Sequence, residues 1–178
     1  MRKLSVFIAA SLDGYIAKPG NDLSFLGLVE KEGEDYGYAE FMATIDTIIL
    51  GRKTYDWVLS QVGTSHFDNM NRDVYVVTRT KRPNVGKTTF YTGNLIGLVQ
   101  QLKSGKNGKN IYCDGGAETI HELLKNNLID EFIISVIPVL LGSGIALFKE
   151  GRLEQRLKLF RVESFDTGLV QLHYSRAL

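Results

Sequence analysis

The chain of 178 residues carries 21 Lys and Arg against 20 Asp and Glu, so its formal charge is close to neutral. No large field of one sign is available to draw it onto DNA, RNA or an anionic membrane, and we expect neither kind of partner. With 44% hydrophobic and 23% charged residues, the composition is globular, and the length fits a single domain over residues 1–178. The only cysteine, Cys113, excludes an internal disulfide and favours a reducing compartment, for which the cytoplasm is the natural expectation.

The first predicted element is a short apolar run from Leu4 to Ala10 that ends in a turn at Asp13 and Gly14. Its length and its β-branched members indicate a buried strand rather than the apolar part of a signal peptide. Residues 18–34 combine glycines, a proline and mixed charges without a sustained period, which is typical of a long irregular connection. From Asp35 onward the apolar side chains follow one helical face, which predicts the first helix; they are Tyr38, Phe41, Met42 and Ile45.

Strands and helices then alternate along the chain. The predicted strands are Thr47–Leu50, Val74–Thr78, Thr88–Tyr91, Asn110–Cys113 and Glu131–Ile137. The predicted helices are Arg52–Leu59, Leu95–Ser104 with Asn94 as its cap, and Ala117–Asn126. Two final strands, Leu157–Ser164 and Leu169–Ser175, flank the turn at residues 166–168 and predict an antiparallel hairpin. The fold class is therefore α/β, with a mixed, mostly parallel central sheet and a C-terminal antiparallel hairpin.

Several motifs resemble known sites but lack an essential member. Gly142–Leu147 begins like a dinucleotide fingerprint, yet a leucine replaces the third glycine and no clear helix follows, so we expect a loop. His121–Lys125 has a lysine where a zinc protease needs its second histidine. His66 is expected in a loop and His173 in the last strand. Cys113 lies at the end of an apolar strand, where a cysteine is usually a small buried hydrophobic residue. No metal site is predicted.

Three predicted strand ends are each followed directly by groups that bind anions. They are Gly51-Arg52-Lys53-Thr54, Thr78-Arg79-Thr80 and Gly115-Gly116-Ala117-Glu118-Thr119. Helix N-termini and bare glycine backbone accept phosphates closely, and two arginines suit a 2′-phosphate, whereas NAD-selective sites place an acid near the ribose. Taken singly, Arg52 could be a solvated cation and the glycine pair a tight turn. Taken together, the three segments predict a site for NADPH.

Five segments together resemble the dihydrofolate-reductase-like superfamily, and most closely the reductase domain of the bifunctional deaminase-reductase of bacterial riboflavin biosynthesis and its stand-alone bacterial relatives. These segments are Ser11–Ala17, Asp46–Tyr55, Val76–Arg79, Asp114–Thr119 and Ile137–Phe148. The resemblance extends over nearly the whole chain and implies a three-layer fold with helices on both faces of the sheet. It also implies NADPH as the cofactor.

The resemblance assigns a place on the cofactor to each matching position. Ala9 and Ile16 match backbone positions that hold the nicotinamide carboxamide. The phosphate-binding turn is matched by Gly51, Arg52, Lys53 and Thr54, and the surroundings of the 2′-phosphate by Thr78 and Arg79. Gly115 and Gly116 match a glycine pair whose peptide is typically cis, at the start of the helix that begins with Ala117, Glu118 and Thr119.

The same resemblance places two candidate catalytic residues. Asp35 falls at the carboxylate that grips a pterin in dihydrofolate reductases, and Ser135 at a hydroxyl on the facing strand. A buried acid with a raised pKa could protonate the nitrogen of a C=N bond during hydride addition, whereas the alternative is that Asp35 only caps a helix. Residues 22–34 lack the tryptophan and proline of true dihydrofolate reductases, and the chain lacks the His-x-Glu and Pro-Cys-x-x-Cys signature of the fused deaminase.

The expected function is reduction of a small-molecule heterocycle of the pyrimidine or pterin type by NADPH, similar to that of 5-amino-6-(5-phosphoribosylamino)uracil reductase. One alternative is a true dihydrofolate reductase, and another is a non-catalytic NADPH-binding or regulatory module. Relatives of this kind are commonly homodimers, and the apolar Val136–Leu141 region could support such a contact.

Overall fold

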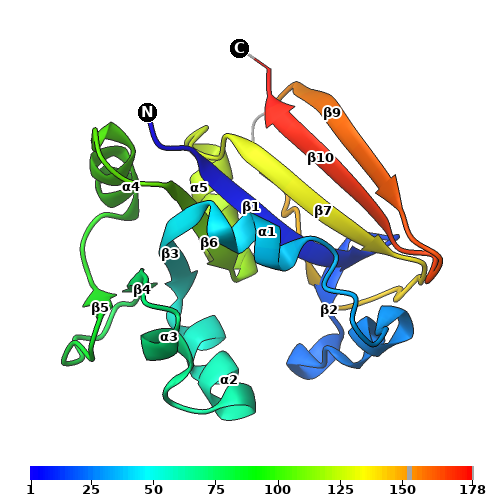
Figure 1. Cartoon of the computed structure of the whole chain (residues 1–178), viewed down its shortest axis with the longest axis horizontal. Coiled ribbons are helices and arrows are strands. Elements are labelled where there is room, and N and C mark those ends of the chain that lie inside the picture. The colour runs from blue at the N-terminus through cyan, green and yellow to red at the C-terminus, as the bar shows by residue number, and fades with distance from the viewer. Residues whose placement is uncertain (152–153, 178) are drawn as a thin grey trace.

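Strand β1 (Leu4–Ser11) lies near the middle of the main sheet, because a mostly apolar run must be covered on both faces. It pairs in parallel with β6 (Asn110–Gly115) on one side and with β7 (Glu131–Ile137) on the other. The computed structural model describes residues 1–151 and 154–177, and its eight-stranded sheet has the order β5-β4-β3-β6-β1-β7-β10-β9 (Figure 1). β1, the first strand in the sequence, therefore connects the strands β5-β4-β3-β6 with the strands β7-β10-β9.

The remaining strands of this sheet are β3 (Ile45–Gly51), β4 (Asp73–Val77), β5 (Thr88–Tyr91), β9 (Leu157–Ser164) and β10 (Val170–Arg176). β3 pairs in parallel with β6 and with β4, and β4 pairs in parallel with β5. β10 runs antiparallel to both β7 and β9. The predicted mixed, mostly parallel sheet with a closing antiparallel hairpin is confirmed.

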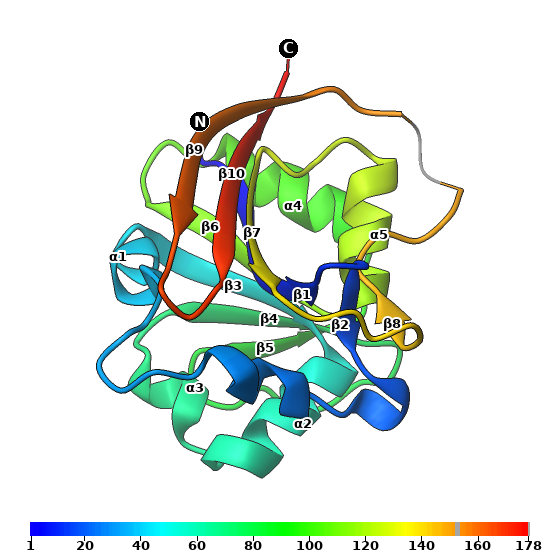
Figure 2. The ribbon, with the colours of Figure 1, turned by 90° about the vertical axis from the view of Figure 1, so that its right-hand side faces the viewer.

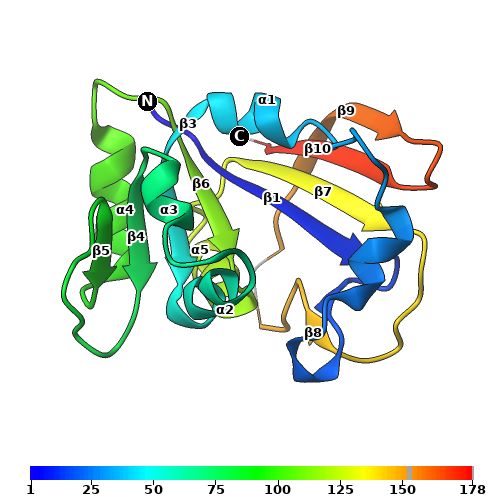
Figure 3. The ribbon, with the colours of Figure 1, turned by 60° about the horizontal axis from the view of Figure 1, so that its bottom comes forward.

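Helices cover both faces of the sheet, which confirms the three layers. The helices α4 (Leu95–Ser104) and α5 (Ala117–Lys125) pack on one face, and α1 (Tyr38–Ala43), α2 (Arg52–Val62) and α3 (His66–Asn69) pack on the other (Figure 3). As predicted, Asn94 caps α4, because its Oδ1 accepts the backbone N–H of Ile96 at 2.9 Å. No helix in residues 1–151 or 154–177 is long and apolar enough to cross a membrane.

Two short elements depart from the expected loops. His66 begins α3 instead of lying in a loop, since the buried ring of Phe67 stacks on Tyr55 with 5.1 Å between ring centroids and fixes this single turn. The segment expected as a loop around Gly142 contains β8 (Ile145–Ala146), which pairs with β2 (Tyr15–Ala17) (Figure 2). Strands of two and three residues are too short to show a period of two.

The long connection after β2 is irregular, as expected, but it contains the 3-10 helices η1 (Pro19–Asn21) and η2 (Ser24–Val29). Phe25 and Val29 of η2 are buried against Ile137 and Leu169. This small third core places η2 over the carboxyl ends of β1 and β7. Next to it, Leu140 is 70% exposed, and the homodimer contact expected over Val136–Leu141 stays a prediction.

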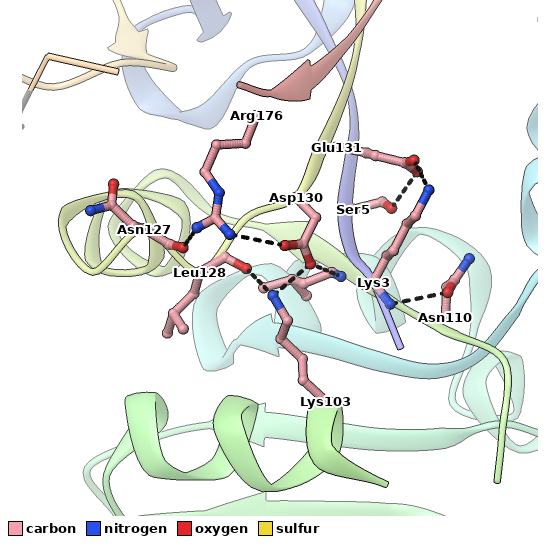
Figure 4. A network of polar contacts seen from close by, with 10 residues as sticks. Lys3, Ser5, Lys103, Asn110, Asn127, Leu128, Asp130, Glu131 and Arg176 are labelled. Carbon is pink, nitrogen blue, oxygen red and sulfur yellow. Dashed lines mark hydrogen bonds and ion pairs between the residues drawn. The ribbon is translucent and has the colours of Figure 1, made fainter. Parts of the chain in front are cut away.

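A polar network holds the opposite edge of the sheet, where β1 and β7 begin (Figure 4). The Asp130 carboxylate accepts the backbone N–H of Leu4 at 2.8 Å and the Lys103 ammonium at 2.6 Å, and it lies 3.6 Å from the Arg176 guanidinium. Lys3 pairs with Glu131 at 2.6 Å. One half-buried carboxylate therefore connects the start of β1, the last turn of α4 and the end of β10.

Asp13 fixes the loop that follows β7 against the turn that follows β1. Its carboxylate accepts the Ser11 hydroxyl at 2.6 Å and the backbone N–H groups of Leu141 and Gly142 at 3.0 and 2.7 Å. These bonds, that from Ser11 above all, lower the pKa of Asp13 to about 2. Further along the same loop, Gly144 has a φ of +146°, and a methyl group on its Cα would lie 2.0 Å from the Ala17 carbonyl oxygen.

Gly144→Ala is expected to destabilise the protein by about 2 kcal/mol or more, because the new methyl meets backbone rather than a mobile side chain and the φ is one that L residues avoid. Thermal unfolding followed by circular dichroism measures the change. Gly97→Ala is the matched control, since Gly97 is in α4 and its new methyl meets no atom closer than 4.0 Å. It is expected to stabilise by up to about 1 kcal/mol. Equal effects would contradict the proposed clash.

Candidate active site

A pocket of about 510 Å³ opens on the α1 face of the sheet, near the carboxyl ends of β1 and β7. Phe7 and Ala9 of β1 and Ser135 of β7 form its floor, and Ala9 pairs directly with Ser135 in the sheet. The rings of Tyr38 and Tyr112 form one wall, with Phe7 and Tyr38 in edge contact at 5.6 Å between centroids. The aromatic and apolar side chains suit a flat ring, and four charged residues also line the pocket, namely Glu30, Lys31, Glu34 and Asp35.

The cover of this pocket is residues 24–36, which include η2. It is attached to the turn between β9 and β10 at several points. The Tyr36 hydroxyl lies 3.0 Å from the Thr167 hydroxyl, and the Tyr36 ring packs on Phe165 with 4.8 Å between centroids. Lys31 pairs with Asp166 at 2.6 Å. The cover therefore depends on the C-terminal hairpin as well as on its own small core.

Two of the three predicted anion-binding turns meet at the carboxyl ends of β3 and β6. A methyl group on Gly51 would lie 3.0 Å from the Thr119 hydroxyl, and one on Gly116 would lie 3.0 Å from the Thr54 hydroxyl. The peptide between Gly115 and Gly116 is cis. At these positions the glycines let the two backbones approach as side chains would not allow. The two glycine turns therefore adjoin at one end of the sheet.

The third turn lies beside them, and the loop that continues from it is attached to α2 by an ion pair of Arg82 that the sequence did not reveal. Thr78 follows β4 directly beside Gly51, because Gly51 pairs with Val77. The Asp56 carboxylate accepts the Arg52 guanidinium at 2.7 Å and the Arg82 guanidinium at 2.8 Å, which lowers the pKa of Asp56. Asp56 thus ties the loop after β4 to α2. The four-residue spacing of Arg52 and Asp56 could have indicated their ion pair from the sequence, whereas no spacing rule indicated the pair of Asp56 with Arg82.

The other residues assigned to the cofactor lie around these turns. Lys53 and Arg79 are exposed cations, while Ala117 and Thr119 are buried at the start of α5. Glu118 is exposed and pairs with Lys149, which lowers the pKa of Glu118. At the other end, Ala9 lines the pocket, and Ile16 is half-buried against the core on the α4 and α5 face.

Asp35 lines the pocket and also caps α1. Its carboxylate accepts the backbone N–H groups of Gly37 and Ala39, both at 2.9 Å. The two interpretations of this residue therefore do not exclude each other. Asp35 is exposed, however, so the expectation of a buried acid is not met at this position.

A half-buried acid does lie behind the pocket wall, at Asp114 near the end of β6. Burial raises the pKa of Asp114 to about 6, against the effect of the Tyr112 hydroxyl, which donates to its Oδ1 at 2.7 Å. The same hydroxyl lies 3.1 Å from the Phe7 carbonyl oxygen. When Asp114 is protonated, Tyr112 can donate to Phe7 and accept the acid proton. In the sequence, Asp114 was assigned only to the segment Asp114–Thr119, although an acidic residue at the end of an apolar strand could have indicated a shielded carboxylate.

Ser135 is almost fully buried and lines the pocket floor. Its hydroxyl oxygen accepts a hydrogen bond from the Gln171 side-chain amide at 3.0 Å. The two residues assigned to catalysis, Asp35 and Ser135, therefore face the same chamber from its cover and from its floor.

A dihydrofolate-reductase-like α/β sheet with adjoining glycine turns at the ends of β3 and β6 and a pocket at β1 and β7 defines the class of this protein. Its sequence matches the RibD C-terminal domain family over residues 2–171, and the chain belongs to that family. It is thus a RibD C-terminal reductase-like domain, of an enzymatic family that typically uses NADPH.

Two curated relatives match over nearly their whole length. YwjB of Bacillus subtilis (strain 168), described as uncharacterized, is 44% identical over 177 residues, or 99% of each chain. YyaP of the same strain, described in the same way, is 29% identical over 97% of this chain and 94% of its own.

Solved structures share the fold. A protein of Shewanella sp. PV-4, assigned provisionally to riboflavin biosynthesis, is 32% identical with a TM-score of 0.87, and 99% of each chain is covered. The Thermotoga maritima diaminohydroxyphosphoribosylaminopyrimidine deaminase/5-amino-6-(5-phosphoribosylamino)uracil reductase gives a TM-score of 0.73 at 12% identity. Its comparison covers 99% of this chain but 57% of that one, and it shows the fold alone.

Tyr112→Phe is expected to raise the pKa of Asp114 further, because it removes the one hydroxyl that stabilises the ionised carboxylate. Since a hydrogen bond to a charged group stabilises by about 1.5 kcal/mol or more, the increase should be about one unit. A carbon-13 NMR titration of the aspartate carboxyls measures it. Tyr38→Phe, which alters the same wall without removing that bond, is the control. An unchanged Asp114 pKa in Tyr112→Phe would refute the assignment.

Proposed function

We propose that this protein is an NADPH-dependent reductase of a flat heterocycle of the pyrimidine or pterin class, similar to 5-amino-6-(5-phosphoribosylamino)uracil reductase. The order of the strand ends carries the proposal. The two glycine turns lie at the ends of β3 and β6, and the covered pocket lies at the ends of the next strands, β1 and β7. An extended dinucleotide laid along this edge would leave its reactive ring at Ala9, beside the pocket.

The cofactor half would be held by groups that are already in place. The close-packed backbone at Gly51 and Gly116 admits the pyrophosphate, and Arg52 and Arg79 supply cations for the 2′-phosphate. When bound, NADPH supplies a hydride to a C=N or C=O carbon of the substrate. The chain's own residues have the tasks of holding the two rings together and of delivering a proton to the neighbouring nitrogen or oxygen.

Asp114 and Tyr112 are suited to the proton transfer. A pKa of about 6 leaves a protonated fraction of Asp114 near neutral pH, and Tyr112, whose hydroxyl contacts that acid, lines the pocket. In the proposed transfer, Tyr112 would give up its hydrogen bond to the Phe7 carbonyl oxygen, pass its hydroxyl proton to the substrate and take the Asp114 proton. Asp35, on the cover, is placed to bind a polar edge of the ring. The rings of Phe7 and Tyr38, which are in edge contact, would pack against the substrate ring.

Arg79→Ala is expected to weaken NADPH binding tenfold or more, with little effect on NADH, because only NADPH carries the 2′-phosphate that pairs with this cation. Calorimetry with both nucleotides measures the ratio. Lys106→Ala removes a cation from the loop at the opposite edge of the sheet and serves as the control. Equal losses for NADPH and NADH would count against the 2′-phosphate assignment, and no heat with NADPH in the parent protein would end the reductase proposal.

Turnover with the ribosylaminopyrimidine substrate and with dihydrofolate, followed by NADPH oxidation, tests the reaction itself. We expect the ribosylaminopyrimidine to be reduced faster. Preference for dihydrofolate would instead make the protein a dihydrofolate reductase. Tight NADPH binding without oxidation by either compound would make it a binding module.

Asp114→Asn is expected to lower kcat at least a hundredfold while NADPH binding is kept, because it removes the proton source. Asp35→Asn should raise KM more than it lowers kcat. Since the protonated carboxyl is required, the parent kcat should fall as pH rises through about 6, and this dependence should disappear in Asp114→Asn. A pH profile that is identical in the parent and in Asp114→Asn would assign the proton to another group.

A further inference from the structure

A chain of buried polar side chains leads away from the pocket floor across β7, β10 and β9. Ser135, Gln171 and His173 are 3, 2 and 7% exposed, and Ser135 pairs with Gln171 across the antiparallel strands. The Gln171 amide nitrogen lies 3.0 Å from the Ser135 hydroxyl, and its amide oxygen lies 2.8 Å from the His173 Nε2. Each of these buried side chains therefore has a hydrogen-bond partner, as buried polar groups in folded proteins normally do.

The backbone of Tyr36 determines which way the Gln171 amide faces. The Tyr36 carbonyl oxygen, which can only accept, lies 3.1 Å from the Gln171 Nε2. The atom opposite that carbonyl must therefore be the NH₂ group, and a flipped amide would set two oxygens against each other. Both hydrogens of the NH₂ group are then used, one on Tyr36 and one on Ser135. The amide oxygen is left facing His173.

His173 completes the direction of the chain. Its Nε2 has two oxygen neighbours, Gln171 Oε1 at 2.8 Å and Glu163 Oε1 at 3.4 Å. Both oxygens accept, so Nε2 carries the hydrogen of the imidazole. In each bond of the chain the donor is therefore the residue farther from the pocket: His173 donates to Gln171, and Gln171 donates to Ser135.

The direction of these bonds determines where the hydrogen of the Ser135 hydroxyl points. Its oxygen already accepts from Gln171, so the hydroxyl hydrogen is directed elsewhere, and Ser135 lines the pocket floor beside Ala9. We propose that Ser135 presents a fixed hydrogen-bond donor to the pocket, and that Gln171 is the positioning residue that sets this polarity. The ligand must then carry an acceptor at this point, such as a carbonyl oxygen or an unprotonated ring nitrogen. This inference rests on the proposed function only in taking the pocket as the substrate site.

The polarity of the chain can be measured without any ligand. Long-range proton–nitrogen NMR of protein labelled at histidine distinguishes the two neutral tautomers, and His66 and His121 give reference signals in the same spectrum. We expect His173 as the Nε2–H tautomer near neutral pH. The Nδ1–H tautomer would reverse the donor and acceptor along the chain and overturn the inference.

The recognition itself is tested with two flat, neutral probes of equal size, pyridine N-oxide as an acceptor and aniline as a donor. Their dissociation constants are measured by saturation-transfer NMR with the protein saturated with NADPH. The parent protein should prefer pyridine N-oxide at least tenfold. A parent protein that binds pyridine N-oxide no better than aniline overturns the inference.

Two substitutions at the same site separate positioning from a merely structural role. Gln171→Glu replaces the donor by an acceptor, so the Ser135 hydrogen turns away from the pocket and the preference should invert toward aniline. Gln171→Met, of similar volume, should leave the hydroxyl free to rotate and bring the ratio close to one. If both variants retain the parent ratio, Gln171 does not set the polarity. Ser135→Ala keeps the amide bond to Tyr36 and should also lose the preference, which covers a failure of Gln171→Glu to fold.

Calorimetry with NADPH on the same samples distinguishes this inference from the proposed function. Absence of NADPH binding in the parent protein would contradict the reductase proposal. NADPH binding together with equal affinity for the two probes would contradict only the donor role of Ser135.

Discussion

Parallel pairing of β1 with β6 and β7 is the constraint on which the arrangement of this protein depends. Because neighbouring parallel strands end at one edge, the glycine turns after β3 and β6 and the pocket at β1 and β7 become adjacent without further loops. The opposite edge is held by Asp130, which connects the start of β1 to α4 and β10. The Asp130 network and the candidate site therefore lie at opposite ends of the same strands.

The two halves of the site differ in their electrostatics. Around β3 and β4 the polar groups are cations and bare backbone amides, with Asp56 shared between two arginines. The pocket at β1 and β7 is lined by a serine and tyrosine hydroxyls, and its cover adds the charged side chains of Glu30, Lys31, Glu34 and Asp35. Asp114 lies at the boundary, on β6, where burial raises the pKa of its carboxyl to about 6. The cations around β3 and β4 suit an anionic cofactor, and the mixed lining at β1 and β7 suits a flat ring with a polar edge.

Sequence periodicity predicted the elements that are long enough to carry it. The bounds of α4, its Asn94 cap and the strand Glu131–Ile137 agree with the structure. β8 has only two residues and α3 a single turn, and tertiary contacts rather than local pattern create both. Local sequence could therefore give the order of the longer elements and the type of sheet, but not these short elements.

The site was predictable to a similar extent. The three candidate anion-binding turns could be identified because each follows a strand directly, and the contact of two of them at Gly51 and Gly116 follows from the strand order. The pairs that orient the chemistry join residues far apart in the chain, such as Asp56 with Arg82 and Ser135 with Gln171, and no spacing rule connects them. The sequence also could not decide between the two roles of Asp35, because its carboxylate both caps α1 and lines the pocket.

The cover over the pocket is a single uninterrupted stretch, residues 24–36, held by its small core on Ile137, by Gln171 and by the hairpin turn through Tyr36 and Lys31. None of those attachments involves the glycine turns or the arginines. Insertion, deletion or replacement within this stretch would reshape the chamber while the strand ends beneath it were inherited unchanged. The fold is in this sense modular, and relatives can diverge in the molecule they accept by exchanging one loop.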